Sequence, residues 1–89
     1  MRVITAPHVA VKITGDGRLE LASAETGERY RFGPAETAMW IALWQHDGEL
    51  EAAAAELANH WDADSERLRG AFDTWVRELH DVGLVRYRR

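Results

Sequence analysis

The chain has 89 residues, a length that corresponds to one domain with a single modest core. Apolar residues make up 46% and charged residues 29%, a balance typical of a globular protein rather than a disordered one. The formal net charge of −4 argues against a nucleic-acid partner, because such partners are held largely by basic side chains. The absence of cysteine excludes disulfides, thiolate metal ligands and thiol catalysis.

The sequence predicts neither a signal peptide at residues 1–5 nor a membrane span. Residues 1–5 lack the apolar run of a signal peptide, and no segment approaches the roughly 18 apolar residues of a membrane span. A chain without cysteine also suits a reducing compartment. We therefore expect a cytoplasmic protein with no membrane partner, and we expect the basic end, residues 86–89, to be a solvated tail.

The first third of the chain predicts three strands. Apolar and polar residues alternate in residues 9–13, 19–22 and 29–32, which is the period of a half-buried strand. Gly15-Asp16-Gly17 and Thr26-Gly27 are turn signals between these segments. The expected arrangement is a three-stranded antiparallel meander that is apolar on one face.

Two helices are predicted after this sheet. Pro34 suits the first position of a helix, and Glu36 would lie in its first turn, where the helix dipole favours an acid. Asp47-Gly48 ends that helix, and a second helix follows from about Leu50 to His60, with an alanine-rich stripe of high helix propensity.

A third helix has the clearest periodic signal. Apolar residues recur every three or four positions in residues 68–82, and Gly83 is placed to end the helix in a left-handed conformation. Asp62, Asp64 and Ser65 are candidate N-caps. The expected fold class is α+β, a three-stranded sheet followed by three helices that cover its apolar face.

Residues for catalysis or metal binding are hard to find. None of the four histidines has a histidine or cysteine three or four positions away, whereas a metal needs three or four convergent ligands. Ser65 is explained as a helix cap, and Gly15-Asp16-Gly17 is better explained as a hairpin turn than as a phosphate-binding loop. We therefore expect no enzyme, no metal and no cofactor.

The last strand of the meander is a candidate binding element. It pairs with one neighbour only, so its other edge is expected to be open. Arg29 and Arg31 could blunt this edge, or the edge could accept a peptide as an added strand. The residues alone leave both interpretations open, and they do not tell which alternate residues of the strand face outward.

The order of these elements resembles the PqqD-like family of leader-peptide recognition elements. The matching segments are LELASAETGERYRF (19–32), TAMWIAL (37–43), AAAAEL (52–57) and VRELHDVGL (76–84). The resemblance extends from about Val9 to Val85. Within the family, the Thr-Gly-x-x-Tyr strand and the Ala-Met-Trp helix are most similar to the stand-alone recognition proteins of lasso-peptide clusters.

The resemblance implies a winged helix-turn-helix-like fold and a role in peptide binding rather than catalysis. It implies that the leader of a ribosomally synthesised precursor (RiPP) peptide, here of a lasso peptide in antibiotic biosynthesis, docks by strand addition and is delivered to a partner protease or cyclase. The strand residues that would supply ladder bonds are Glu28, Arg29, Tyr30, Arg31 and Phe32. The residues that would line an apolar groove are Leu68, Phe72, Trp75 and Val76, although most of this stripe must be core.

The resemblance further implies that Arg29, Arg31 and Arg69 meet acids in the leader. Two other functions remain as alternatives. One is a winged-helix DNA-binding regulator, which is disfavoured because acids and arginines are balanced along the third helix. The other is a homodimerising structural protein that uses the same open edge.

Overall fold

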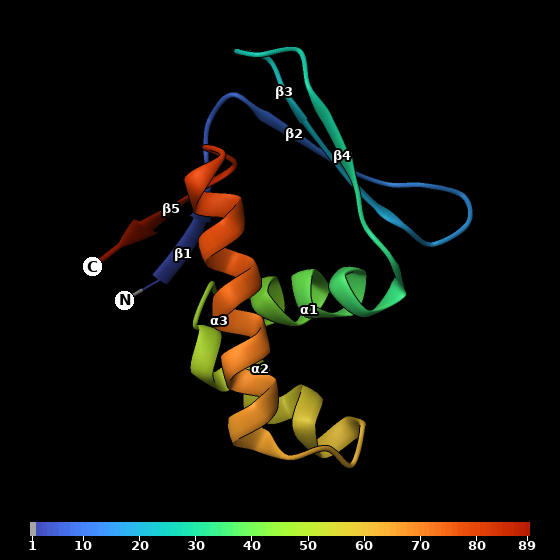
Figure 1. The fold of residues 1–89 in the computed structure, drawn as a ribbon, viewed down its shortest axis with the longest axis vertical. Coiled ribbons are helices and arrows are strands. Elements are labelled where there is room, and N and C mark those ends of the chain that lie inside the picture. Colours follow the sequence, from blue (N-terminus) through green and yellow to red (C-terminus); the bar gives the residue numbers. More distant parts are fainter. Residues whose placement is uncertain (1) are drawn as a thin grey trace.

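The structure, a computed structural model that describes residues 2–89, contains two antiparallel sheets and three helices (Figure 1). The elements in chain order are β1 (Arg2–Thr5), β2 (Val9–Ile13), β3 (Leu19–Ser23), β4 (Arg29–Arg31), α1 (Pro34–Gln45), α2 (Leu50–His60), α3 (Ser65–Asp81) and β5 (Val85–Arg88). The predicted α+β class, with a three-stranded sheet followed by three helices, is confirmed.

The main sheet has the strand order β2-β3-β4. Leu21 of β3 lies between Val11 of β2 and Tyr30 of β4, so these three side chains share one face of the sheet. Leu19 and Leu21 are completely buried there. The helices do not cover the apolar face completely at β2, where the side chains of Val11 and Ile13 are 45% and 46% exposed.

The second sheet joins the two ends of the described chain. β1 pairs antiparallel with β5, with Arg2 opposite Arg88 and Thr5 opposite Val85. The expectation of a solvated tail is therefore wrong for residues 86–88. Val3 and Val85 are both buried, so this short pair of strands is held by core packing as well as by its ladder.

Local sequence signals explain where the helices begin and end. α1 starts at Pro34 and α2 spans the predicted residues. Of the three candidate N-caps of α3, the structure selects Asp64, whose side chain accepts hydrogen bonds from the backbone N–H groups of Glu66 and Arg67. Gly83 follows α3 with a φ of +80°, as predicted. None of the helices in residues 2–89 is long and apolar enough to cross a membrane.

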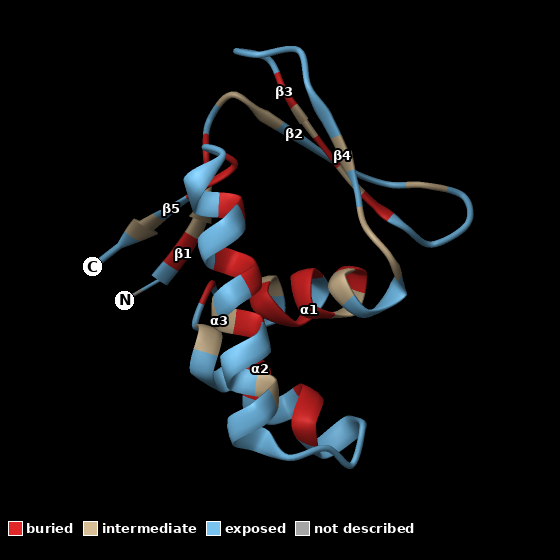
Figure 2. Cartoon of the chain, in the orientation of Figure 1, coloured by how far each residue is buried: buried red, intermediate tan, exposed pale blue. Residues whose placement is uncertain are grey.

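The core lies where the helices meet the sheets. α2 packs against α1 and α3, α1 contacts β3, and α3 contacts β5. In Figure 2, buried residues alternate with exposed ones along α3 and with intermediate ones along β3, as expected when one side of each element faces the core. Aromatic rings connect two of the helices, because Trp40 of α1 packs edge-on against Trp75 of α3 at 6.4 Å.

Thr37 joins the end of the main sheet to α1. Its buried hydroxyl donates to the carbonyl oxygen of Gly33 at 2.8 Å and accepts from the backbone N–H of Leu19, also at 2.8 Å. The first N–H of β3 thus obtains a partner from a helix rather than from a strand. This contact sets the position of α1 beneath the end of β4.

We expect Thr37→Val to lower the free energy of unfolding by about 1–3 kcal/mol, because it leaves the buried N–H of Leu19 without an acceptor while keeping the side-chain volume. Urea unfolding measures the loss. Thr37→Ser, which keeps the hydroxyl, is the control and should lose less. A valine variant as stable as wild type would show that this hydroxyl does not hold the two elements together.

Candidate functional site

β4 is an edge strand of the main sheet and pairs with β3 alone. The backbone N–H of Phe32 donates to Leu19, and the carbonyl oxygen of Glu28 accepts from Ser23, both at 2.9 Å. Backbone groups alternate in direction along an antiparallel strand. The N–H and C=O groups of residues 28, 30 and 32 therefore point to β3, whereas those of Arg29 and Arg31 point to the open edge.

The arginine side chains of β4 lie on the solvent face of the sheet. Arg29 and Arg31 approach the same carboxylate, that of Glu20 on β3, at 3.8 and 3.9 Å. Both guanidinium groups remain largely exposed. One carboxylate thus faces two guanidinium groups, and the face beside the open edge keeps a positive charge that can attract acidic residues of a partner.

Tyr30 and Phe32 project to the other face, toward the helices, and both are half-buried. Burial raises the pKa of the Tyr30 phenol, and the hydrogen bond that it donates to Glu28 at 3.1 Å raises this pKa further. The Phe32 ring packs edge-on against Trp75 with 5.4 Å between ring centroids. This contact links the end of β4 to α3.

One side of α3, which we call the outer flank, carries Trp75, whose ring contacts Phe32 at the end of β4. Residues spaced three or four apart share this side of the helix: Leu68, Ala71, Trp75, Glu78 and Val82. Val82, at the C-cap, is 50% exposed, although its place in the apolar stripe predicts only a core role. Leu68 and Ala71 line a shallow hollow of about 510 Å³ near the start of the helix.

Trp75 contributes both apolar surface and a polar group to this junction. It is 8% exposed, and its indole N–H is buried with no hydrogen-bond acceptor among residues 2–89. A buried donor without a partner costs about 1–3 kcal/mol.

Two predicted groove residues do not reach the surface. Phe72 and Val76 are both 0% exposed, because they occupy the middle of the apolar stripe of α3 and pack into the core. The prediction that they line the groove is corrected accordingly. Trp75, which contacts Phe32, is the residue of the stripe that lies next to the end of β4.

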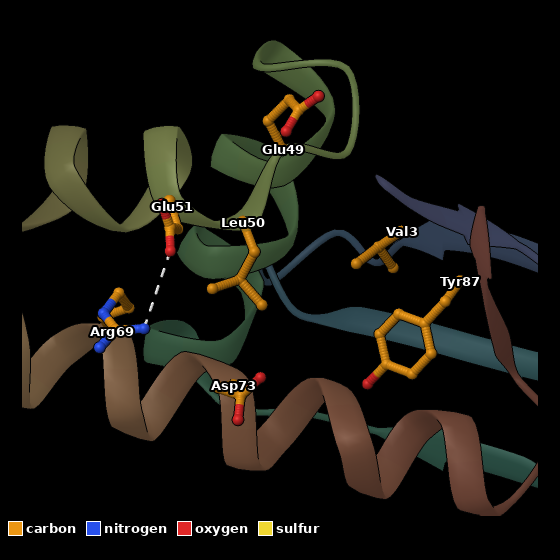
Figure 3. A pocket seen from close by; sticks show the side chains of 7 residues that line it. All are labelled: Val3, Glu49, Leu50, Glu51, Arg69, Asp73 and Tyr87. Carbon is orange, nitrogen blue, oxygen red and sulfur yellow. Dashed lines mark ion pairs between the residues drawn. The ribbon is translucent and has the colours of Figure 1, made fainter. Parts of the chain in front are cut away.

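Arg69 lies on the opposite flank of α3 from Trp75. It pairs with Glu51 of α2 at 3.8 Å and borders a pocket of about 320 Å³ between α2, α3 and the smaller sheet (Figure 3). The expectation that Arg69 acts together with Arg29 and Arg31 is therefore corrected, because it faces away from β4. Residue spacing shows that Arg69 and Trp75 lie on different sides of α3. It does not show which of these sides faces β4, and the contact between Trp75 and Phe32 decides that.

The pocket beside Arg69 is lined by three acids (Figure 3), and each of them has an arginine partner. These pairs are Glu49 with Arg2 at 3.4 Å, Glu51 with Arg69 at 3.8 Å, and Asp73 with Arg77 at 3.0 Å. Burial raises the pKa of the neighbouring Tyr87, and Asp73 raises it further. Paired acids and a neutral phenol do not form an acid–base set.

The described part of the chain contains no cluster of three or more His, Asp or Glu side chains that could hold a metal ion. What the edge of β4 and the outer flank of α3 offer is backbone hydrogen bonds, positive charge and apolar contact. This combination suits binding of an extended chain.

Comparison with known proteins brought no match: no protein-family model, no curated protein and no solved structure is similar to this chain.

Proposed function

We propose that this protein binds the leader segment of a ribosomally synthesised precursor peptide, which adds to the main sheet as a further strand beside β4. The observation that carries the proposal is the outward direction of the backbone groups of Arg29 and Arg31. Alternate residues with outward N–H and C=O groups are what an added strand requires. Ladder bonds of this kind supply affinity without depending on the side chains of the peptide.

Side chains around β4 would make binding selective for certain peptide sequences. Arg29 and Arg31 outnumber Glu20 on the solvent face, which favours a leader with acidic residues there. On the helical face, the half-exposed Val82 offers apolar surface for one anchor of the leader. Since successive residues of a strand alternate between faces, acidic and apolar residues would alternate in the bound segment.

The resemblance to PqqD-like recognition elements supports a leader rather than an arbitrary peptide. In the proposed role the protein performs no chemistry itself and presents the precursor to a partner protease or cyclase, as in lasso-peptide biosynthesis. The cytoplasm, where ribosomal precursors are made, is the proposed location.

DNA binding is less well supported by the charges on α3. Arg67, Arg69 and Arg77 share this helix with Asp73, Glu78 and Asp81. Two of the three arginines are already paired, Arg69 with Glu51 and Arg77 with Asp73. Little positive charge is left for phosphates, and steep salt dependence of binding to duplex DNA would be the result that favours a regulator instead.

The proposal is tested with a fluorescent synthetic peptide of about ten residues in which acidic and apolar residues alternate, as proposed for the leader. We expect Val82→Ala to raise the Kd in fluorescence anisotropy about fivefold, because a half-exposed apolar side chain loses contact worth about 1 kcal/mol.

The matched control is Ile41→Ala, which removes a comparably exposed apolar side chain, at 44%, from α1. It should leave leader binding unchanged. If both variants bind with wild-type affinity, or if both are weakened equally, the outer flank of α3 is not where the leader lies.

A further inference from the structure

A second surface with the properties of a binding site lies between α1 and the end of α2. A hollow of about 450 Å³ lies at the surface there, and its lining includes Ala38, Ile41, Leu57, His60, Trp61 and Glu56. The hollow is bordered by one large apolar side chain from each helical region. It is distinct from the edge of β4 and from the outer flank of α3.

The apolar side chains at the rim are unusually accessible. Ile41 is 44% exposed and Trp61, which directly follows α2, is 42% exposed. Half-exposed tryptophan beside a concave surface is typical of the residues that dominate protein–protein binding energy. The size of the hollow is sufficient for one or two side chains of a partner.

Glu56 is the acid among the residues that line this hollow, and its carboxylate lies 3.0 Å from Nε2 of His46. Residues 32–66, which include all of α1 and α2, contain no lysine or arginine. Their eight acids are Glu36, Asp47, Glu49, Glu51, Glu56, Asp62, Asp64 and Glu66. Within residues 2–89, arginines reach only Glu49 and Glu51 among these acids. The net charge of −4 therefore conceals a strongly acidic helical pair and a basic remainder.

We propose that the hollow between α1 and α2 binds a basic amphipathic helix of a partner protein. Apolar residues on one side of that helix would contact Ile41 and Trp61, and lysines or arginines beside them would face Glu56 and its acidic neighbours. The same acidity opposes the other candidate occupants. Nucleic acid and anionic membranes would be repelled, and so would the identical face of a second copy.

This inference does not depend on leader binding at β4. Taken together, the two surfaces would let the protein hold an acidic peptide at its basic sheet and a basic partner at its acidic helices. Each surface has its own exposed apolar residue, Val82 in one and Ile41 in the other, so either proposal can fail without the other.

The test uses the full-length protein, labelled with ¹⁵N, and a synthetic amphipathic helix of about 18 residues with leucines along one side and lysines elsewhere. We expect its titration to shift the indole N–H signal of Trp61 and the backbone signal of Ile41, and to weaken as NaCl rises from about 50 mM to about 500 mM. A scrambled peptide of the same composition and a glutamate-for-lysine version should bind at least about tenfold more weakly.

Variants locate the site. Trp61→Ala should raise the Kd for the lysine helix about tenfold or more, and Ile41→Ala about fivefold, whereas Val82→Ala should have no effect. If Trp61→Ala folds poorly, the NMR shifts that the lysine helix causes in the wild-type protein still locate its binding site. The proposal is overturned if the helix does not bind, if its shifts map to β4 or α3, or if the scrambled or acidic peptide binds equally well. Self-association or binding to anionic vesicles that Trp61→Ala abolishes would assign the surface to another occupant and also overturn it.

Discussion

Gly48→Ala is expected to lower the free energy of unfolding by more than about 3 kcal/mol, or to prevent folding altogether. Gly48 is buried in the turn between α1 and α2 with a φ of +80°, and a Cβ there would lie 2.2 Å from the carbonyl oxygen of Val3. The carbonyl oxygen of Gly48 also accepts from the N–H of Val3 at 2.9 Å. The methyl group would thus push β1 off the helical turn.

Gly83 supplies the matched control for this prediction. It has the same φ of +80°, but no atom lies within 4 Å of the position that a Cβ would take. Gly83→Ala should therefore cost only the backbone strain, about 1 kcal/mol. Chemical denaturation gives the free energy of unfolding of both variants, and the difference between them is the cost of the steric clash with β1. If both variants lose the same free energy of unfolding, the close approach of β1 to Gly48 contributes nothing.

Proline placed in β4 is expected to give two different results. Tyr30→Pro and Phe32→Pro remove N–H groups that point to β3, and they should destabilise the protein by about 3 kcal/mol or more. Arg29→Pro and Arg31→Pro remove N–H groups that point to the open edge, where proline is tolerated. These two variants should stay folded and lose affinity for the leader about tenfold or more.

Two controls isolate the backbone contribution in this scan. Arg31→Ala removes the side chain but keeps the N–H, so the difference in Kd between Arg31→Ala and Arg31→Pro reports the ladder bond alone. Val11→Pro places proline on the opposite edge of the sheet, where the N–H of Val11 also points outward because its neighbours in the strand bond to β3.

Thermal unfolding and leader anisotropy are measured on every proline variant. Full-strength binding by the folded Arg29→Pro and Arg31→Pro proteins would rule out strand addition at β4. Loss of binding in Val11→Pro alone would move the peptide to β2, whose edge carries the half-exposed Val11 and Ile13.

Much of the fold could be predicted because its signals are local. The strands and turns of the main sheet follow from alternation and from glycines such as Gly17 and Gly27, which adopt positive φ at tight turns. Proline at the start of α1 and glycine after α3 mark helix ends through interactions within one turn of the helix.

The candidate site was only partly predictable for the same reason. Arg29 and Arg31 lie at the edge strand as expected, but periodicity does not distinguish the centre of an apolar stripe from its border. Phe72 and Val76 at the centre are buried, whereas Val82 at the border is exposed. The acidic character of residues 32–66 is visible in the sequence, yet its meaning depends on the hollow that α1 and α2 form.

The sequence by itself determined the α+β class and the order of the elements of the main sheet and helices. Only the tertiary structure decided that β1 pairs with β5, that the backbone groups of Arg29 and Arg31 face outward, and that Arg69 lies on the flank of α3 away from β4. The physical reason is range. Caps, turns and amphipathic periods act between residues a few positions apart, whereas strand pairing and helix orientation arise from contacts between residues far apart in the chain.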